Sequence, residues 1–323
     1  MTGAAFVRTL LGDIDPADLG VTYAHEHLII QASWTTLHHP DHLLDSVEDA
    51  VAELAPAQAL GLRAVVDGMP ADTGRDVLAL AEIARRTGLH LIAPTGFHHE
   101  RHYPPRHWTG RIGTDELAGV LIGEIEVGID ALDLSAPVVR RTPHRAGLIK
   151  VAGSLGGPST RDEPIFIAAA IAQARTGCPI LTHCEQGTGG LEQVALLERH
   201  GGNAAGIALS HVDKVVDRGY HRELLATGAT LEYDQSFRWG TAENGTLRLL
   251  AWAAEDGALD RIVLGMDAAR RGYWRVHGGT PGMEWLLGPF AARMREIGLD
   301  ETAIARLFVA NPARVYAFRP PAA

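Results

Sequence analysis

The sequence predicts an α/β protein and, within that class, a (β/α)8 TIM barrel. Short aliphatic runs alternate with segments that carry apolar residues at helical spacing, which implies parallel βα units. An open doubly wound sheet fits the same alternation. A doubly wound nucleotide-binding fold shows a glycine-rich turn after its first strand, whereas that strand here ends in His25-Glu26-His27-Leu28. The count of eight strands and the length of 323 residues therefore favour the closed barrel.

Eight apolar runs are predicted as strands, because each is short and bounded by polar or turn residues. They span residues 22–29, 64–67, 90–95, 147–151, 179–183, 207–211, 229–233 and 262–266.

Helices are predicted between these strands. In the segment 76–86, for example, Val77, Leu80, Ala81 and Ala84 recur three and four positions apart. The predicted helices span 43–60, 76–86, 165–175, 191–199, 222–227 and 246–256. Glycines are expected to end helices just before the next strand, at Gly61, Gly88, Gly177, Gly201, Gly228 and Gly257. After the eighth strand we expect a long segment, 268–282, and then two helices that end at Asn311-Pro312.

The composition, with 46% hydrophobic and 21% charged residues, is that of a soluble globular protein. Length alone allows one large domain or two average ones, and the barrel interpretation favours a single domain over residues 1–323. No apolar run approaches the roughly 20 residues that span a bilayer, and the N-terminus does not resemble a signal peptide. Two cysteines exclude a disulfide scaffold and favour a cytoplasmic location. The net charge of −10 argues against nucleic acid or anionic membrane as a partner.

The tripeptide His25-Glu26-His27 is the first indication of a functional site. Side chains alternate along a strand, so the two histidines point the same way and can hold a metal between them. The motif alone is a weak signal. In a barrel, however, catalytic groups lie at the C-terminal ends of the strands. Five predicted strands end in a possible ligand, and the set comprises His25, His27, Lys150, His183, His211 and Asp267. Because these residues are expected to meet at one rim, we interpret them as a metal site rather than as isolated loop histidines.

This pattern resembles the phosphotriesterase-like branch of the amidohydrolase superfamily over almost the whole chain. The resemblance also includes the segments 7–12 and 18–22 and the closing Asn311-Pro312. It implies a binuclear metal centre at the C-terminal rim, with all six strand-end residues as ligands. His25, His27 and Asp267 would hold the buried metal, and His183 and His211 the more exposed one.

Lys150 requires a chemical explanation, because a protonated amine cannot ligate a cation. It lies in an apolar strand, between Ile149 and Val151, where burial disfavours the ammonium form. A neutral lysine can add carbon dioxide to form an anionic carbamate, which the resemblance implies as a bridge between two metals. A lysine paired with an acidic neighbour is the alternative.

The expected chemistry is that of a metal-dependent hydrolase acting on ester bonds. Zinc suits a site rich in imidazole and carboxylate, and manganese or cobalt are alternatives. Two metals lower the pKa of a bridging water, so hydroxide could attack a carbonyl or phosphoryl centre, with Asp267 as proton acceptor. Glu26 and Cys184 alternate with the ligands, so both are expected to point away from the metals.

The loops after the last two predicted strands are rich in arginine, which suits phosphate and carboxylate groups. In an acidic chain this predicts an anionic small-molecule substrate, although pairing with surface acids is the alternative. The chain resembles the subgroup of phosphorylated sugar lactonases and phosphotriesterase homology proteins, whose phosphate-binding residues match Arg238, Arg270 and Tyr273. This resemblance implies hydrolysis of a phosphorylated sugar 1,4-lactone.

Other functions stay open. Within the family they are an organophosphate triesterase, an acyl-homoserine lactonase or a carboxylesterase, whose neutral substrates need fewer arginines. A non-catalytic metal-binding barrel and a metal-free α/β protein are more remote. His98 and Tyr103, after the third predicted strand, are further candidate substrate contacts. Family similarity also suggests a homodimer.

Overall fold

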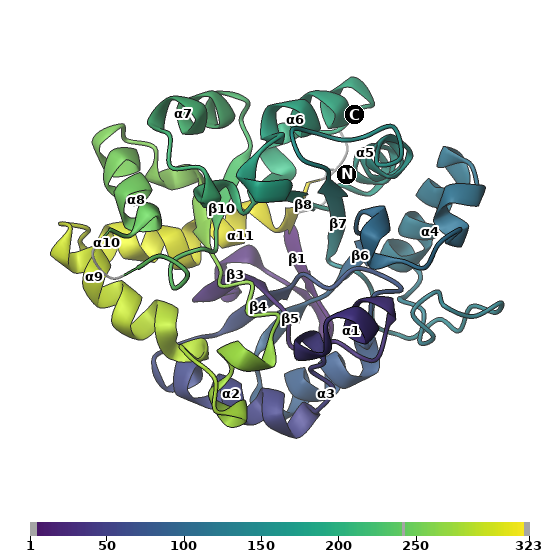
Figure 1. Ribbon diagram of the computed structural model, residues 1–323, viewed down its shortest axis with the longest axis horizontal. Helices are drawn as coiled ribbons and strands as arrows, with labels where there is room; N and C mark the ends of the chain where they lie inside the picture. Colours follow the sequence, from purple (N-terminus) through teal and green to yellow (C-terminus); the bar gives the residue numbers. More distant parts are fainter. Residues whose placement is uncertain (1–4, 241–242, 320–323) are drawn as a thin grey trace.

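A barrel of parallel strands surrounded by helices forms the molecule (Figure 1). The computed structural model describes residues 5–240 and 243–319, so residues 1–4, part of the N-terminus considered above, lie outside it. The barrel strands in this part of the chain are β3 (Thr22–Glu26), β4 (Ala64–Asp67), β5 (His90–Ile92), β6 (Pro94–Gly96), β7 (Leu148–Gly153), β8 (Ile180–Cys184), β9 (Ile207–Ser210), β10 (Thr230–Tyr233) and β11 (Ile262–Leu264). All eight predicted strands are confirmed, the third being divided into β5 and β6.

Strand pairing follows chain order around the barrel. One sheet has the order β3-β4-β5 and the other the order β6-β7-β8-β9-β10-β11, and every neighbouring pair is parallel. β5 and β6 are separated only by Ala93. At the other seam, the amide N–H groups of Met266 and Asp267 donate to the carbonyl oxygen of His25 at 3.2 and 2.9 Å. These bonds join the end of β11 to β3 and place a predicted ligand from each strand side by side.

Six predicted helices are confirmed, within a few residues at each end. They are α2 (Val47–Ala59), α3 (Val77–Thr87), α5 (Glu163–Thr176), α6 (Gly190–Arg199), α7 (Arg218–Ala226) and α8 (Gly245–Glu255). The capping chemistry explains these ends. The Asp76 side chain accepts the amide N–H groups of Leu78 and Ala79, and α3 ends where Gly88 adopts a left-handed conformation with φ of 70°.

The C-terminal prediction is wrong in one respect. After α9 (Ala291–Glu296) and α10 (Glu301–Ala305), the chain does not end its last helix at Asn311-Pro312. Instead α11 (Asn311–Val315) begins there, with Pro312 in its first turn, where a missing N–H is tolerated. Two further helices, α1 (Trp34–His38) and α4 (Thr114–Glu126), were not predicted.

Alternation along the strands separates two apolar layers. Leu148 and Leu181 belong to the cluster that fills the barrel, whereas Ile149 and Ile180 pack between the strands and the helices. Lys150 lies two residues beyond Leu148, and it therefore faces the interior one layer nearer the C-terminal rim.

A small antiparallel sheet, not predicted from the sequence, covers the opposite side of this interior. It consists of β1 (Phe6–Thr9), β2 (Gly12–Ile14) and β12 (Ala317–Phe318). Val7 and Tyr316 pack in the interior cluster, and the Tyr316 hydroxyl donates to the carbonyl oxygen of Ala24 at 2.8 Å. No helix in the described residues is long and apolar enough to cross a bilayer.

Candidate metal centre

The structure brings four predicted ligands together. His25 and Lys150 lie within β3 and β7, and His27 and Asp267 follow the ends of β3 and β11. Nε2 of His27 lies 3.2 Å from Oδ1 of Asp267. Nζ of Lys150 lies 3.2 Å from Nε2 of His25. His25, His27 and Asp267 each offer one ligand atom, and these atoms all lie within 4.8 Å of one another.

The two remaining predicted ligands form a second pair beside the first group. Nε2 of His211 lies 2.9 Å from Nδ1 of His183. The ring centres of His25 and His211 are 5.2 Å apart, so the two groups adjoin. All six residues named from the sequence thus meet in one place.

Two buried carboxylates under this cluster were not identified from the sequence. Nδ1 of His211 donates to Oδ2 of Asp234 at 2.5 Å, and Nδ1 of His25 lies 3.2 Å from Oε2 of Glu232 and 3.5 Å from Asp234. Both acids point into the barrel from β10 or its end and are fully buried. Acidic residues two positions apart at the end of an apolar run were the available signal. They show that β10 contributes to the site although it carries none of the predicted ligands.

A third carboxylate orients His183. Nε2 of this histidine lies 2.8 Å from Oε2 of Glu185, which leaves Nδ1 facing His211. Arg101 in turn holds Glu185 through two hydrogen bonds of 3.3 and 2.9 Å. The loop after β6 is therefore linked to a predicted ligand on β8.

Local backbone geometry aims several of these side chains. His211 and Asp267, each just after a strand, adopt positive φ values of 67° and 49°, which residues other than glycine rarely do. A register shift between Tyr23 and Glu26 interrupts the pairing of β3 with β4 just before His27. Gly68 leaves room for the cluster, since a Cβ there would lie 2.5 Å from the His25 imidazole.

Burial sets the protonation of the cluster. It lowers the pKa of His25 to about 3, with the Lys150 charge adding to the effect, and it lowers the pKa of Lys150 itself to about 8. Burial alone would raise the pKa of Asp267, but the His27 hydrogen bond and the charges of His25 and Arg238 keep it well below its usual value. Neutral imidazoles and ionised carboxylates are the forms that bind metals.

This donor set fits divalent metal ions. Because a carboxylate only accepts hydrogen bonds, Asp234 fixes a proton on Nδ1 of His211 and leaves the Nε2 lone pair free. The same reasoning frees Nε2 of His25 and Nδ1 of His183. Histidine ligands of metals have this arrangement, with one ring nitrogen on a carboxylate and the other on the ion.

Glu26 and Cys184 point away from the cluster, as predicted. The Glu26 carboxyl accepts the amide N–H groups of Met266 and Ala268 at 2.8 and 3.2 Å, so it fastens the end of β11 behind β3. Cys184 is buried in the apolar layer between the strands and the helices.

The predicted substrate-binding residues gather around one aromatic ring. The guanidinium carbons of Arg238 and Arg270 lie 5.2 and 6.0 Å from the centre of the Tyr273 ring. Arg238 donates to the carbonyl oxygens of Asp234, Met266 and Asp267, at 2.7 to 2.8 Å.

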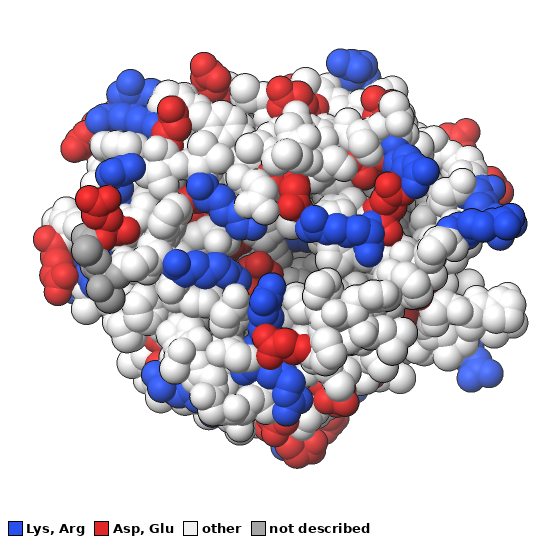
Figure 2. Space-filling view, in the orientation of Figure 1, with Lys and Arg blue, Asp and Glu red and all other residues white. Residues whose placement is uncertain are grey.

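Arg270 differs from Arg238, since it is exposed and no hydrogen bond or ion pair engages its side chain within the described residues. Figure 2, drawn in the orientation of Figure 1, shows basic side chains around the hollow at the centre of the face in view.

The two candidates in the loop after β6 differ in availability. Tyr103 is buried, and its hydroxyl accepts the His98 amide N–H at 2.8 Å and donates to the Ala71 carbonyl oxygen at 3.1 Å. These bonds suit a structural role. The His98 ring is 4.9 Å from the ring of His183, at the edge of the cluster.

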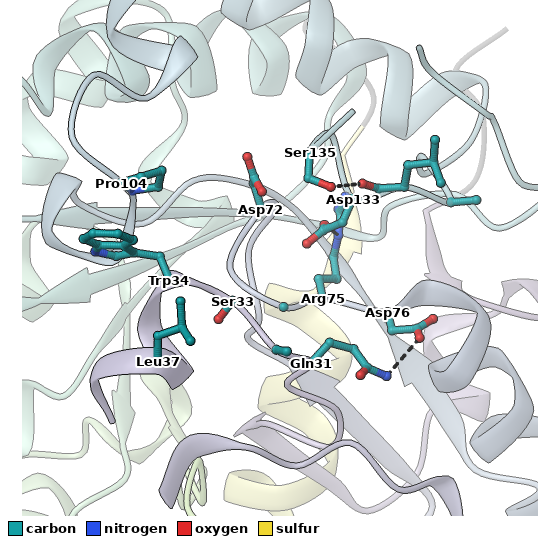
Figure 3. A pocket seen from close by; sticks show the side chains of 14 residues that line it. Gln31, Ser33, Trp34, Leu37, Asp72, Arg75, Asp76, Pro104, Asp133 and Ser135 are labelled. Atoms are coloured by element: carbon teal, nitrogen blue, oxygen red, sulfur yellow. Dashed lines mark hydrogen bonds and ion pairs between the residues drawn. The ribbon is translucent and has the colours of Figure 1, made fainter. Parts of the chain in front are cut away.

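A separate cavity of about 430 Å³ lies between α1 and the loop after β4 (Figure 3). Trp34 and Leu37 line one side, and Asp72, Arg75 and Asp133 the other. None of the six predicted ligands lines it, so it is not the predicted reaction site.

Known proteins share both the sequence and the fold. The model of the phosphotriesterase family matches residues 5–316. A phospho-furanose lactonase of Mycoplasmopsis synoviae is 32% identical, over 97% of this chain and 92% of its own length. The crystal structure of an amidohydrolase from Mycoplasma synoviae superposes with a TM-score of 0.93 and 31% identity, over 99% of this chain and 94% of that one.

A phosphotriesterase homology protein of Escherichia coli, solved with phosphate in its active site, superposes with a TM-score of 0.84 at 28% identity. That comparison covers 93% of this chain and 99% of the other. The match extends along nearly the entire described chain and includes the strands that carry the cluster, and the protein therefore belongs to the phosphotriesterase family.

Proposed function

We propose that this protein is a metal-dependent lactonase that opens a phosphorylated sugar 1,4-lactone. Relatives named phospho-furanose lactonase, at 32% identity over nearly the whole chain, support the lactonase activity. The observation that carries the phosphorylated substrate is the group formed by Arg238, Arg270 and Tyr273 next to Asp267.

The six clustered residues would hold two divalent ions, of which zinc is the best match to imidazole and carboxylate ligands. We propose that Lys150 takes part as a carbamate, which its low pKa and its place beside His25 favour. Bound metals supply Lewis-acid polarisation and lower the pKa of water.

The remaining steps of the proposed reaction fall to side chains of the protein. In lactone hydrolysis, water oxygen bonds to the carbonyl carbon, the ring C–O bond breaks, and one proton moves from water to the departing ring oxygen. Asp267 is the proposed carrier of that proton. Arg238 donates to its main-chain carbonyl at 2.8 Å and lies 3.5 Å from its Oδ2, so it holds this carboxylate in position.

Arg270 is the proposed phosphate anchor, because it is exposed and adjoins the site. Burial lowers the pKa of His42 to about 4, and the charges of Arg270 and His27 add to the effect. The Arg270 guanidinium therefore acts on the same histidine as the predicted ligand His27. A guanidinium there can bind phosphate oxygens without giving up another ion pair.

The test compares one furanose lactone with and without its phosphate, using enzyme loaded with zinc. We expect faster turnover of the phosphorylated lactone. Arg270→Ala should raise its KM roughly tenfold to a hundredfold, which corresponds to losing a hydrogen bond to a charged group. The same change should barely affect the neutral lactone.

Arg275→Ala is the matched control, since Arg275 is exposed in the same segment but pairs with Glu284. It should leave both substrates unaffected. The proposal of a phosphorylated substrate would be refuted if the enzyme opened the neutral lactone faster and if Arg270→Ala left this order of the two substrates unchanged. Hydrolysis of organophosphates or simple carboxylesters in preference to any lactone would refute the lactonase.

A further inference from the structure

A second group of histidines lies beside the predicted metal centre, in the loop after β6. His98 and His99 are followed by His102, which lies in the short 3-10 helix Glu100–His102. His99 is the N-cap of this helix and lies three positions before His102, and His98 precedes it in the chain. The ring centres of His98 and His102 are 3.8 Å apart, and those of His98 and His99 are 4.5 Å apart.

The nitrogens of this group are close enough to share an ion. Each histidine offers one ring nitrogen, and these three atoms lie within 4.8 Å of one another. Nitrogen ligands about 2.0 to 2.1 Å from a tetrahedral zinc ion are separated by about 3.4 Å. Small side-chain rotations therefore suffice to close the group around a metal.

One buried nitrogen of the group has a carboxylate near it but no hydrogen bond among the described residues. His99 is 6% exposed, and its Nε2 forms no hydrogen bond within the described residues. The Glu185 carboxylate lies 3.4 Å from this nitrogen. A buried polar atom without a partner is costly, and a bound cation between imidazole and carboxylate would remove that cost.

We propose that His98, His99 and His102 form a third metal site, which takes a divalent ion such as zinc, cobalt or nickel. This site adjoins the six-residue centre, because His99 also has a ligand atom within 4.8 Å of His183 and Glu185. The His98 and His99 rings lie 4.9 and 5.4 Å from the His183 ring. Imidazole ligands suit these ions better than calcium or magnesium.

The third site is weaker than the centre, because its ligands must give up existing bonds. His102 receives the Nε–H of Arg101 on its Nε2 at 3.3 Å, and Nδ1 of His98 accepts the His99 amide N–H at 2.9 Å. Arg101 is more than half exposed and can turn away. Its departure would free Nε2 of His102 for the ion, while Glu185 keeps its bond to His183.

Metal stoichiometry tests this proposal. Protein carrying two zinc ions is dialysed against increasing zinc or cobalt, and bound metal per chain is measured. We expect a third, weaker equivalent in the wild type. A double variant with His99→Asn and His102→Asn should stop at two equivalents, which also shows that it folds. His200→Asn, at an exposed histidine elsewhere, should keep all three.

Arg101→Ala sharpens the test, because it removes the donor that occupies Nε2 of His102. We expect it to tighten binding of the third equivalent several-fold. A wild type that saturates at two equivalents up to millimolar metal would overturn the proposal. The proposal would also fail if the double variant still bound a third metal ion, or if Arg101→Ala weakened binding of that ion.

Discussion

Replacing Lys150 with methionine should remove a pH-dependent cost from the folding of the metal-free protein. Lys150 is 2% exposed inside the barrel, and burial is the main cause that lowers its pKa from 10.5 to about 8. The charges of Asp267, Glu232 and Asp234 act in the opposite direction but do not restore the ordinary value. Methionine has a similar length and no charge to desolvate.

The free-energy cost of burying the Lys150 charge follows from the shift in its pKa. At about 1.4 kcal/mol for each pKa unit, the difference between 10.5 and about 8 corresponds to about 3 kcal/mol. The unfolded chain keeps the lysine proton up to its ordinary pKa, whereas the folded chain releases it at about pH 8. The unfolded state therefore binds more protons across this window, and stability rises with pH.

Urea unfolding of chelator-treated protein in carbon dioxide-free buffer measures this effect. Between pH 7 and pH 9.5, the wild type should gain about 2 kcal/mol relative to Lys150→Met. Lys214 is the other lysine of the chain and is partly exposed, so Lys214→Met should show the same pH dependence of stability as the wild type. Equal pH dependence of the wild type and Lys150→Met would refute the reasoning that Lys150 is destabilised by burial.

Three further predictions concern the surroundings of the cluster. Asp234→Asn should weaken metal binding roughly tenfold to a hundredfold in a metal titration, since it disturbs a carboxylate that orients two histidines; unchanged affinity would contradict this. Glu26→Ala should lower the free energy of unfolding by about 1 to 3 kcal/mol, because the buried amide N–H of Ala268 loses its acceptor while that of Met266 keeps the carbonyl oxygen of His25; an unchanged free energy in urea unfolding would contradict this. Gly68→Ala should reduce bound metal per chain by driving a Cβ against His25, whereas Gly119→Ala, which has open space around it, should not.

Local patterns predicted the fold well where each element carries its own signal. The eight barrel strands are short apolar runs, and helices such as α3 have an apolar face and clear caps. Prediction failed where the signal lies elsewhere in the chain. β12 has two residues and exists because β1 pairs with it from the other end of the sequence. The continuation through Asn311-Pro312 likewise depends on Asn311, whose side chain donates to the carbonyl oxygens of Leu259 and Ile262.

The predicted ligands were recognisable for a simple reason. Strand ends of a parallel barrel meet at one rim, so the position of His183 or His211 at the end of its strand places it without knowledge of distant contacts. Alternation also predicted that Glu26 faces away from His25 and His27. The ligand roles of these residues stay predictions that metal analysis can test.

The sequence by itself thus determined the barrel, the residues that meet at its rim and the direction in which most of them face. These properties follow from periodicity and chain order, which are local. Only the tertiary structure decided which atoms meet. Glu232 is 207 residues from His25, yet it lies against that ring, and Arg238 proved to be engaged largely by main-chain carbonyls. Such contacts depend on barrel closure and on side-chain packing across it, and no local pattern encodes them.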